Sequence, residues 1–371
     1  MNKEYERKEM NKELNEIFKG IVEVEDNDTN KENANMSSET PAGQMLKFAS
    51  ETSKRYALEN LVSGKYANLH KEGYIHIHDL DYYPTKTTTC VQYDLKELFE
   101  KGFHTKYGYI RPAKRIDSRA TLATIIFQSN QAEQHGGQAI PAFDFAMADG
   151  VLKTFKDKFI EQLTSLKKEE TENISYIINN EIYSIELTEK DIFKLRELLD
   201  ISISDIRNAL DIALKITRKE THQSMEGFIH NLNTMHSRAG NQVVFSSINY
   251  GTDSSPEGRM VIEEVMNATV EGLGDGETPI FPIQIFKVKE GLNFCLEDYT
   301  LALNNWTKAV RGELKYKTPN FDLLVKACIT SSKRLFPNFL FLDTSYNKHD
   351  LWNINDPDRY KYEVATIESV A

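Results

Sequence analysis

The chain has 371 residues, of which 27% are charged, 40% hydrophobic and 10% aromatic, a composition typical of a globular protein rather than a disordered, collagen-like or coiled-coil chain. Its 45 basic and 56 acidic side chains leave a net charge of −11 at pH 7, which argues against a nucleic-acid partner but not against a local cationic pocket. No apolar run reaches the roughly 18 residues of a membrane-spanning helix, and the charged N-terminus lacks the apolar stretch of a secretory signal. We therefore expect a cytoplasmic protein without a membrane partner.

The N-terminal part of the chain is predicted to be mainly helical. Residues 1–32 are expected to form a frayed helix and a tether. Thr40 followed by Pro41 is typical of a helix start, and small residues recur every three or four positions after it. This spacing predicts a closely packed helix that stops near Gly64. Residues 74–80, YIHIHDL, alternate as a strand does.

The middle of the chain mixes predicted strands and helices. TTTCVQYDL (87–95) favours a strand, whereas residues 120–131 predict a helix, with a strand as the alternative. Residues 150–221 differ in their residue pattern from the flanking sequence, and we expect them to be a peripheral elaboration of the fold. Within them, ISYIINNEIYSIEL predicts a hairpin that turns at Asn179-Asn180.

Two helices are predicted after that hairpin. Thr188 and Asp191 have the spacing of a capping box before the first helix. SDIRNALDIALKI then places apolar residues on one helical face, namely Ile206, Leu210, Ala213 and Leu214.

The rest of the chain alternates short apolar runs with helical patterns. The runs VVFSSINYG, IFPIQIF and NFLFLD predict strands. Strand and helix in alternation indicate an α/β fold, with a barrel as its expected form. The ending KYEVATIESVA stops just after an apparent strand whose edge nothing covers, so we expect a fold that another polypeptide completes.

The three cysteines, Cys90, Cys295 and Cys328, form no CxxC pair. An odd number of isolated thiols argues against a disulfide framework and a cysteine zinc site. Cys328 is predicted to lie on a helix in the core. Cys90 either packs as a small apolar side chain or takes part in one-electron or proton-donating chemistry, which needs no neighbouring cation.

The segment IHIHDLDYY contains a possible ligand set. On a strand, His76 and His78 would point to one face, and Asp79 follows at the strand end. Two histidines and a carboxylate can bind a metal ion. The alternative, which we prefer, is that they are hydrogen-bonded residues of a pocket wall, with no metal.

A basic run interrupts the acidic chain. Lys106, Arg111, Lys114, Arg115 and Arg119 fall within fourteen residues. A pocket for a triphosphate is one interpretation of this contrast, and a solvated, salt-bridged face is the other.

Three glycine-rich segments, 133–145, 237–253 and 271–282, adjoin apparent strands. None has the spacing of a phosphate-binding loop or a dinucleotide fingerprint. They either lie along one rim of a barrel, where backbone approaches a ligand, or are ordinary turns. The candidate substrate contacts in the first two are His135, Gly136, Gly137, Ser246 and Ser247.

Several of these strings together resemble a known family. NANMSSETPAGQML, GYIHIHDLDYYPTKTTTCVQYDL, GYIRPAKRIDSRATLATIIFQSNQ, EQHGGQAIPAFDF, HSRAGNQVVFSSINYGTDSSPEGRM, GLGDGETPIFPIQIF and KRLFPNF occur in this order. They resemble the anaerobic, oxygen-sensitive ribonucleoside-triphosphate reductases of the glycyl-radical enzyme class, from about Asn33 to about Ala365.

The resemblance implies a ten-stranded α/β barrel made of two five-stranded halves, of which residues 33–371 would form the first. In such enzymes a thiyl radical takes the 3′ hydrogen of a ribonucleotide and the 2′ hydroxyl leaves as water. Formate or a dithiol then completes the deoxynucleotide. Cys90 would lie under the ribose and act at the 2′ position. The resemblance also implies a homodimer, deoxynucleoside triphosphate and ATP effectors, and a radical-SAM activating enzyme.

The sequence departs from this family in what it lacks. It has no MGCRT-like string with the thiyl cysteine, no four-cysteine zinc module, no C-terminal radical glycine and too few N-terminal residues for an ATP-binding cone. We therefore expect a fragment that is inactive alone and needs a C-terminal half. The alternative is a non-catalytic nucleotide-binding or assembly remnant.

Overall fold

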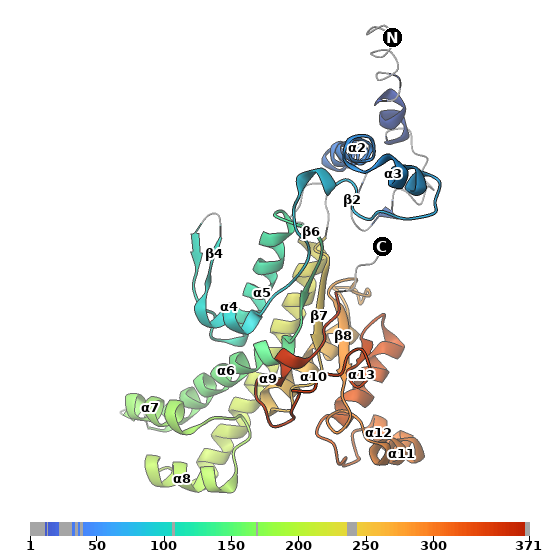
Figure 1. Ribbon diagram of the computed structural model, residues 1–371. Helices are drawn as coiled ribbons and strands as arrows, with labels where there is room; N and C mark the ends of the chain where they lie inside the picture. The colour runs from blue at the N-terminus through green and yellow to red at the C-terminus, as the bar shows by residue number, and fades with distance from the viewer. Residues whose placement is uncertain are drawn as a thin grey trace. The chain divides into compact units, whose positions relative to one another are not determined.

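The computed structural model describes residues 12, 14–21, 32–33, 36–37, 40–105, 108–167, 170–235 and 243–367 (Figure 1). It divides into two compact units, which are described separately. The first contains Met1–Val91, Ile126–Gly137 and Thr234–Phe245, and the second contains Gln92–Ile125, Gln138–Asn233 and Ser246–Ala371. Within the described ranges, no helix combines the length and the apolarity needed to cross a bilayer.

A five-stranded sheet with the order β3-β6-β7-β8-β9 organises the fold. Its strands are β3 (Thr89–Gln92), β6 (His135–Ile140), β7 (Ser246–Tyr250), β8 (Ile283–Val288) and β9 (Asn338–Phe341). The pairs β6–β7, β7–β8 and β8–β9 are parallel. Every residue of β7 and β8 is buried, which is typical of parallel strands with near-continuous apolar runs. The α/β class is therefore confirmed, as are the strands predicted within TTTCVQYDL, VVFSSINYG, IFPIQIF and NFLFLD.

The helices predicted after Thr40, at residues 120–131, after Thr188 and from Ser204 are present, whereas several others were not predicted from the sequence. The helices are α2 (Pro41–Tyr56), α3 (Gly64–Lys71), α4 (Leu95–Lys101), α5 (Ile116–Gln131), α6 (Phe143–Leu166), α7 (Thr171–Glu181), α8 (Glu189–Leu199), α9 (Ile203–Thr234), α10 (Pro256–Glu271), α11 (Leu296–Asn304), α12 (Trp306–Val310) and α13 (Phe321–Lys333). Two small antiparallel pairs complete the order: β1 (Glu32–Asn33) with β2 (Met36–Ser37), and β4 (Phe103–Thr105) with β5 (Gly108–Ile110).

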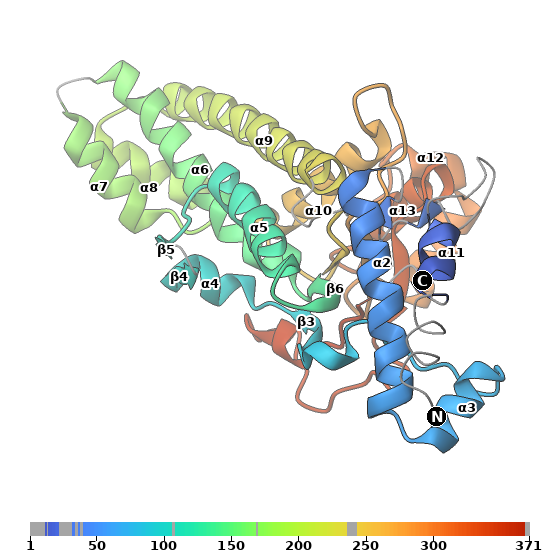
Figure 2. The same ribbon diagram turned by 90° about the horizontal axis from the view of Figure 1, so that it is seen from above.

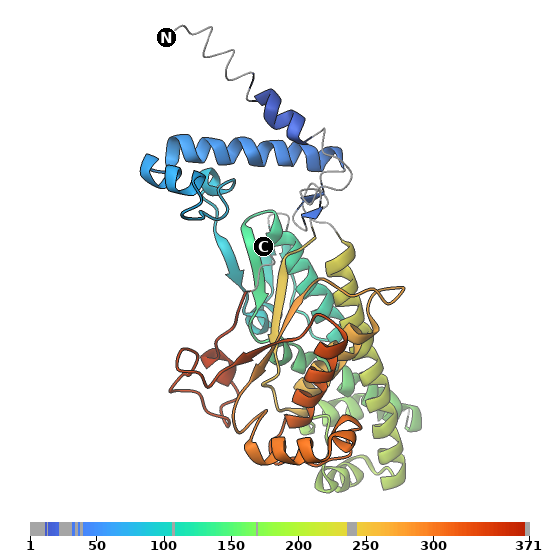
Figure 3. The same ribbon diagram turned by 90° about the vertical axis from the view of Figure 1, so that its right-hand side faces the viewer.

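Helix α10 packs against both α6 and α13 along the strands of the second unit (Figure 3). α6 contacts β7, and α13 contacts β8. α7 and α8 lie at the end of α6 and α9 that is far from the sheet (Figures 1 and 2). Within this unit, α6, α10 and α13 therefore lie on one side of the strands, and the last described segment passes on the other side (Figure 3).

The hairpin predicted at Asn179-Asn180 is wrong, because residues 171–181 form α7. This helix buries Ile174, Ile177 and Ile178, whose spacing of three and four residues is helical. Tertiary burial of that apolar stripe outweighs the turn preference of two adjacent asparagines. The capping box of Thr188 and Asp191 before α8 is confirmed.

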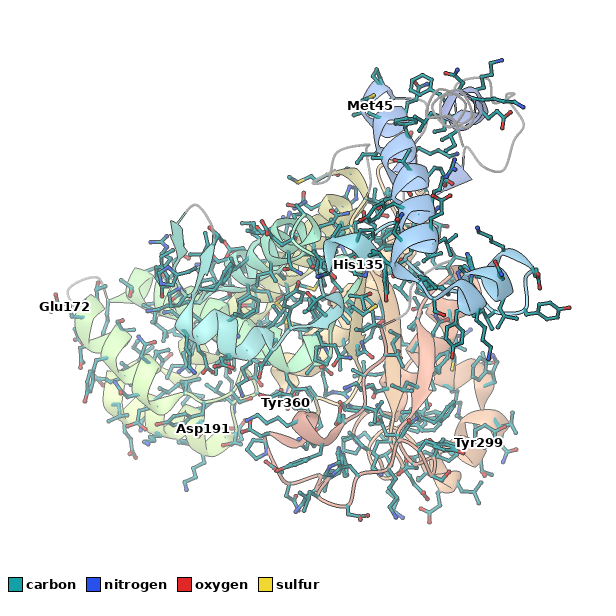
Figure 4. The ribbon with its side chains drawn as sticks, turned by 45° about the horizontal axis from the view of Figure 1, so that its top comes forward. Met45, His135, Glu172, Asp191, Tyr299 and Tyr360 are labelled. Atoms are coloured by element: carbon teal, nitrogen blue, oxygen red, sulfur yellow. The ribbon has the colours of Figure 1, made fainter. Side chains whose placement is uncertain are left out.

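The first unit confirms one helix start and corrects two predictions. The Thr40 hydroxyl accepts a hydrogen bond from Gly43 N at 3.1 Å, as a cap residue should. Gly64 does not end a helix but begins α3. The prediction of close packing along α2 is also wrong within this unit, because Gly43 is the one buried residue of the helix. Met45, for example, is 63% exposed and points away from the helix (Figure 4).

Residues 74–80 are turns and irregular backbone, so the strand predicted for YIHIHDL is wrong. Tyr74 N and Ile75 N donate to Leu69 O at 2.9 and 3.3 Å, and Ile77 N donates to Nδ1 of His70 at 3.2 Å. These amide groups are therefore hydrogen-bonded to the end of α3 and cannot pair with a neighbouring strand.

Buried charges hold the last described segment in the second unit. Glu363 lies 3.1 Å from Lys287, and the side chains are 0% and 1% exposed. Residues 359–362 form a 3-10 turn and 363–367 form no strand, so the apparent strand near the C-terminus is not found as far as residue 367. Thr366 is instead bonded to the Asn249 side chain through its N–H and C=O, at 3.0 and 3.1 Å.

A buried carboxylate organises the turn after β7. Asp144, 1% exposed, accepts hydrogen bonds from the backbone N–H groups of Gly251, Thr252 and Asp253 at 2.8, 3.1 and 3.0 Å. Burial and the adjacent Asp144 carboxylate raise the pKa of Asp253 to about 7. The turn therefore holds two acidic groups in little water.

We predict that Asp253→Asn flattens the pH dependence of stability. The folded-state pKa of about 7 lies above the unfolded value of 3.8, so the folded chain binds this proton more tightly and the free energy of unfolding falls as pH rises between these values. The amide keeps the oxygen that accepts from Ser255 N at 2.8 Å. Urea unfolding across this pH range measures the slope, with exposed Asp350→Asn as control. Equal slopes in the wild type and Asp253→Asn would contradict the prediction.

Candidate active site

Cys90 lies on the edge strand β3, where its neighbour β6 comes unusually close. A Cβ at Gly136 would lie 2.6 Å from Thr89 Oγ1 and 3.0 Å from both N and Sγ of Cys90. His135 N donates to Thr88 O at 3.2 Å and so joins the two segments. Cys90 itself is exposed, so its sulfur is available to a reactant.

The imidazole of His135 lies in a polar cluster of the same unit. Its Nδ1 is 2.8 Å from Thr87 Oγ1, and its ring stacks on Tyr82 with centroids 5.0 Å apart and an angle of 5°. Its Nε2 is 3.9 Å from Oδ2 of Asp79, and the side chain of His135 is 10% exposed. The other carboxylate oxygen of Asp79 is 2.9 Å from Nδ1 of His78. The structure therefore brings together Asp79, His135, Gly136 and Cys90, all of which the sequence marked as candidates.

Backbone strain marks this cluster. Asp79, Lys86 and Cys90 have φ values of 53°, 57° and 45°. A non-glycine residue in this region costs roughly 1 to 2 kcal/mol and often marks a functional site. This strain could not be predicted from the residue types, since neither lysine nor cysteine favours the left-handed conformation.

His76 and His78 do not share a strand face, because there is no strand. Both are exposed, and their ring centroids are 5.8 Å apart. Among the residues the structure describes, no three His, Cys, Asp or Glu side chains are grouped so that they could hold a metal ion. The metal interpretation of this segment therefore has no geometric support.

The basic run separates into structural and free cations. Arg119 is 5% exposed and donates to the carbonyls of Ala113 and Ala146 at 3.2 and 2.5 Å. Burial lowers its pKa. Arg115 lies 2.6 Å from Glu220 and 3.6 Å from Asp157. Arg115 is thus salt-bridged, as one interpretation predicts, whereas Arg119 is buried and does not lie on a solvated face.

Arg111 and Lys114 are different. Both are exposed, and neither pairs with a carboxylate in the described parts of the chain. They line a pocket of about 840 Å³ with apolar wall residues Leu122 and Ile125. Lys106 lies outside the described residues. A cationic pocket beside the first turn of α5 fits the triphosphate interpretation.

The remaining candidates lie in buried strands. Gly137 is buried in β6. Ser246 and Ser247 are 2% and 0% exposed in β7. The Ser247 hydroxyl has no hydrogen-bond partner within the described residues, which is unusual for a buried polar group. Most of the loop that precedes them, residues 236–242, lies outside the described ranges.

The third glycine-rich loop is a structural turn. Arg334 donates to Val270 O at 2.6 Å, to Gly276 O at 3.1 Å and to the Thr278 hydroxyl at 3.2 Å. The ordinary-turn interpretation therefore holds for residues 271–282.

The other two cysteines differ from Cys90. Sγ of Cys295 accepts a hydrogen bond from Asp298 N at 3.4 Å and so caps α11. Cys328 lies on α13, as predicted, but it is exposed, so its predicted place in the core is wrong. It borders an apolar pocket of about 360 Å³ whose walls include Trp306 and Phe341. The sequence analysis missed this pocket because its residues come from separate elements.

We predict that Gly136→Ala destabilises the chain more than Gly73→Ala. Both glycines have φ of 79°, but a Cβ at Gly73 would meet nothing within 4 Å. The two variants share the backbone strain, so their difference isolates the collision with Thr89 and Cys90. We expect that difference to be about 1–3 kcal/mol in the free energy of unfolding. Equal losses in urea unfolding would contradict the close approach of β3 and β6.

Comparison with known proteins identifies the family of the chain. The model of the family "Anaerobic ribonucleoside-triphosphate reductase" matches residues 32–365. The anaerobic ribonucleoside-triphosphate reductase of Enterobacteria phage T4 is 27% identical over 325 residues, which are 87% of this chain and 44% of the relative. That of Salmonella typhimurium is 26% identical over 332 residues, which are 89% of this chain and 38% of the relative.

A solved structure is similar over a comparable range. The anaerobic ribonucleotide reductase from Thermotoga maritima, in complex with dATP and CTP, has a TM-score of 0.48 and 14% identity, covering 82% of this chain and 43% of that chain. The chain thus spans less than half the length of these relatives. Since the family model matches nearly all of its residues, the chain belongs to the anaerobic ribonucleoside-triphosphate reductase family.

Proposed function

We propose that this chain supplies the N-terminal, nucleotide-facing half of an anaerobic ribonucleoside-triphosphate reductase, with Cys90 as its catalytic thiol. The observation that carries the proposal is the position of Cys90. Its sulfur is exposed on an edge strand, in a strained conformation that the missing side chain of Gly136 permits. A merely structural cysteine would have no need of such a conformation.

The proposed reaction replaces the 2′ hydroxyl of a ribonucleoside triphosphate with hydrogen and releases water. Two electrons are required, and either formate, oxidised to carbon dioxide, or a dithiol, oxidised to a disulfide, supplies them. Cys90 would lie under the ribose and donate hydrogen at the 2′ position. The radical that starts the reaction, generated with a radical-SAM activating enzyme, would reside in polypeptide that the relatives have beyond the matched region.

The open edges of the sheet support the proposal that a second polypeptide completes the enzyme. β3 and β9 are the edge strands of the five-stranded sheet, and Phe341 on β9 is 56% exposed. Residues 33–371 would form one five-stranded half of a ten-stranded barrel, with 150–221 as peripheral helices. A second half would cover the edges and enclose the site, because radical intermediates must be shielded from water. The chain alone is therefore expected to be inactive.

The substrate contacts follow from the same site. His135, Gly136 and Gly137 on β6 and Asp79 beside them would contact the nucleotide, with His76 and His78 more peripheral. Separately, in the second unit, Ser246 and Ser247 are further proposed contacts, since the buried Ser247 hydroxyl lacks a partner within the described residues.

We predict that Cys90→Ser abolishes deoxynucleotide formation without unfolding the chain. The test is anaerobic assay after co-expression with a C-terminal half from the family and its activating enzyme. A serine hydroxyl cannot donate a hydrogen atom as readily as a thiol, so product should fall below detection, whereas Cys328→Ser, at another exposed thiol, should keep wild-type turnover. Retained activity in Cys90→Ser would refute its catalytic role, and no product from the wild type would count against the whole proposal.

A second function, effector binding, is favoured by the pocket at Arg111 and Lys114. Two unpaired cations beside the α5 N-terminus suit the phosphates of a deoxynucleoside triphosphate or ATP. Such binding needs no radical and would persist in a non-catalytic remnant. We propose that it regulates a homodimer.

We predict that the double change Arg111→Gln and Lys114→Gln weakens dATP binding by about tenfold or more, because each lost cation–phosphate contact is worth roughly 1 kcal/mol or more. Calorimetry on the chain measures this affinity. The control is Lys348→Gln with Lys308→Gln, which removes the same charge from exposed sites elsewhere. Equal weakening in both double variants would show a general charge effect instead of a site.

A further inference from the structure

A chain of hydroxyl groups leads to the imidazole of His135. Thr85 Oγ1 donates to Tyr82 O at 2.6 Å. Thr85 Oγ1 and Thr87 Oγ1 are 2.9 Å apart, and Thr87 Oγ1 is 2.8 Å from Nδ1 of His135. The three contacts form one continuous path that begins at a carbonyl oxygen, which can only accept a proton.

The carbonyl at the start of the path determines which atom donates in each hydrogen bond. Each hydroxyl has one proton, and that of Thr85 is used on the Tyr82 carbonyl. Thr87 must therefore donate to Thr85, and the Thr87 oxygen must accept from His135 if every contact is a hydrogen bond. The path thus favours the tautomer of His135 with its proton on Nδ1, which leaves a lone pair on Nε2.

Nε2 has a carboxylate nearby but not in hydrogen-bond contact. Its distance of 3.9 Å from Oδ2 of Asp79 is too long for a direct bond, and His78 orients the other oxygen at 2.9 Å. The charged and titratable groups that face the imidazole are thus Asp79 and, through it, His78, with the ring of Tyr82 stacked on one side. A proton gained at Nε2 would create a cation beside a carboxylate, which is favourable in a largely buried site.

We infer that Nε2 of His135 accepts a hydrogen bond from a ribose hydroxyl of the bound nucleotide, and takes and returns that hydroxyl proton during the reaction. This inference rests on the proposed function. In the step, the ribose O–H bond breaks and an Nε2–H bond forms, the electron pair stays on the sugar oxygen, and Asp79 balances the imidazolium charge. The proton later returns to the same oxygen, so no outside oxidant or reductant is needed. The ligand class is a nucleotide with an intact ribose diol.

The first test measures the tautomer of His135 and needs no substrate. Long-range ¹⁵N NMR of the histidine-labelled full chain should show Nδ1 protonated and Nε2 bare at neutral pH. Thr87→Val removes the acceptor and should shift His135 toward the other tautomer, whereas Thr87→Ser should keep the wild-type spectrum. Thr300→Val, which alters an exposed helical threonine, is the control. A protonated Nε2 with bare Nδ1 in the wild type would overturn the assignment.

The second test reads the ligand. CTP should move the His135 Nε2 resonance, and one of its analogues that lacks a single ribose hydroxyl should bind without moving it. CTP binding that leaves Nε2 unchanged would refute the inference while the proposed function stands. If calorimetry finds no CTP binding, the proposed function fails and the inference fails with it, although the tautomer would still be measured.

The third test uses the complemented enzyme. His135→Gln keeps a polar side chain but cannot carry the proton, so kcat should fall by about 10²- to 10⁴-fold with KM little changed. Asp79→Asn should give a smaller loss and move the acid limb of the pH–rate profile, which a purely structural role would not do. Unchanged kcat and pH profile in both variants would overturn the catalytic part of the inference.

Discussion

The close approach of β3 to β6 at Gly136 is the constraint on which the candidate site depends. A side chain there would collide with Thr89 and Cys90, so only glycine lets the two backbones meet. Because β6 continues directly from His135, the same approach places the cysteine, the histidine and its hydroxyl path in one unit. The site is thus built from backbone geometry first and from side-chain chemistry second.

In the second unit, buried charged side chains fix the position of the backbone. The Asp144 carboxylate ties three successive amides after β7, and the Lys287–Glu363 pair holds the last described segment against the strands. Glu363 also accepts from the Thr252 hydroxyl and from Trp352 Nε1. Such pairs tolerate burial only with full hydrogen bonding, and loss of one partner leaves an uncompensated charge. These charged groups therefore specify one position for each backbone segment, which non-directional apolar packing alone would not do.

Prediction from sequence succeeded where the cause is local and failed where it is distant. The cap at Thr40 and the capping box at Thr188 depend on residues three positions away, so the pattern was sufficient. YIHIHDL alternates like a strand, yet its amides bond to the end of α3, which no alternation reveals. The basic run left open whether Arg115 and Arg119 bind phosphate, but Glu220 and the Ala146 carbonyl, both distant in the chain, already interact with them.

The amino-acid sequence alone determined the family, the α/β class, several strands of the sheet and the candidate residues Cys90 and His135, since colinear motifs and apolar periodicity are properties of the chain itself. Only the tertiary structure decided which candidates meet. It separated Arg111 and Lys114, which pair with no carboxylate among the described residues, from their paired neighbours, and it joined Thr85, Thr87 and His135 into one hydrogen-bonded path. The reason is physical: contacts between segments depend on three-dimensional distance and on competition for partners, and neither is encoded in local spacing.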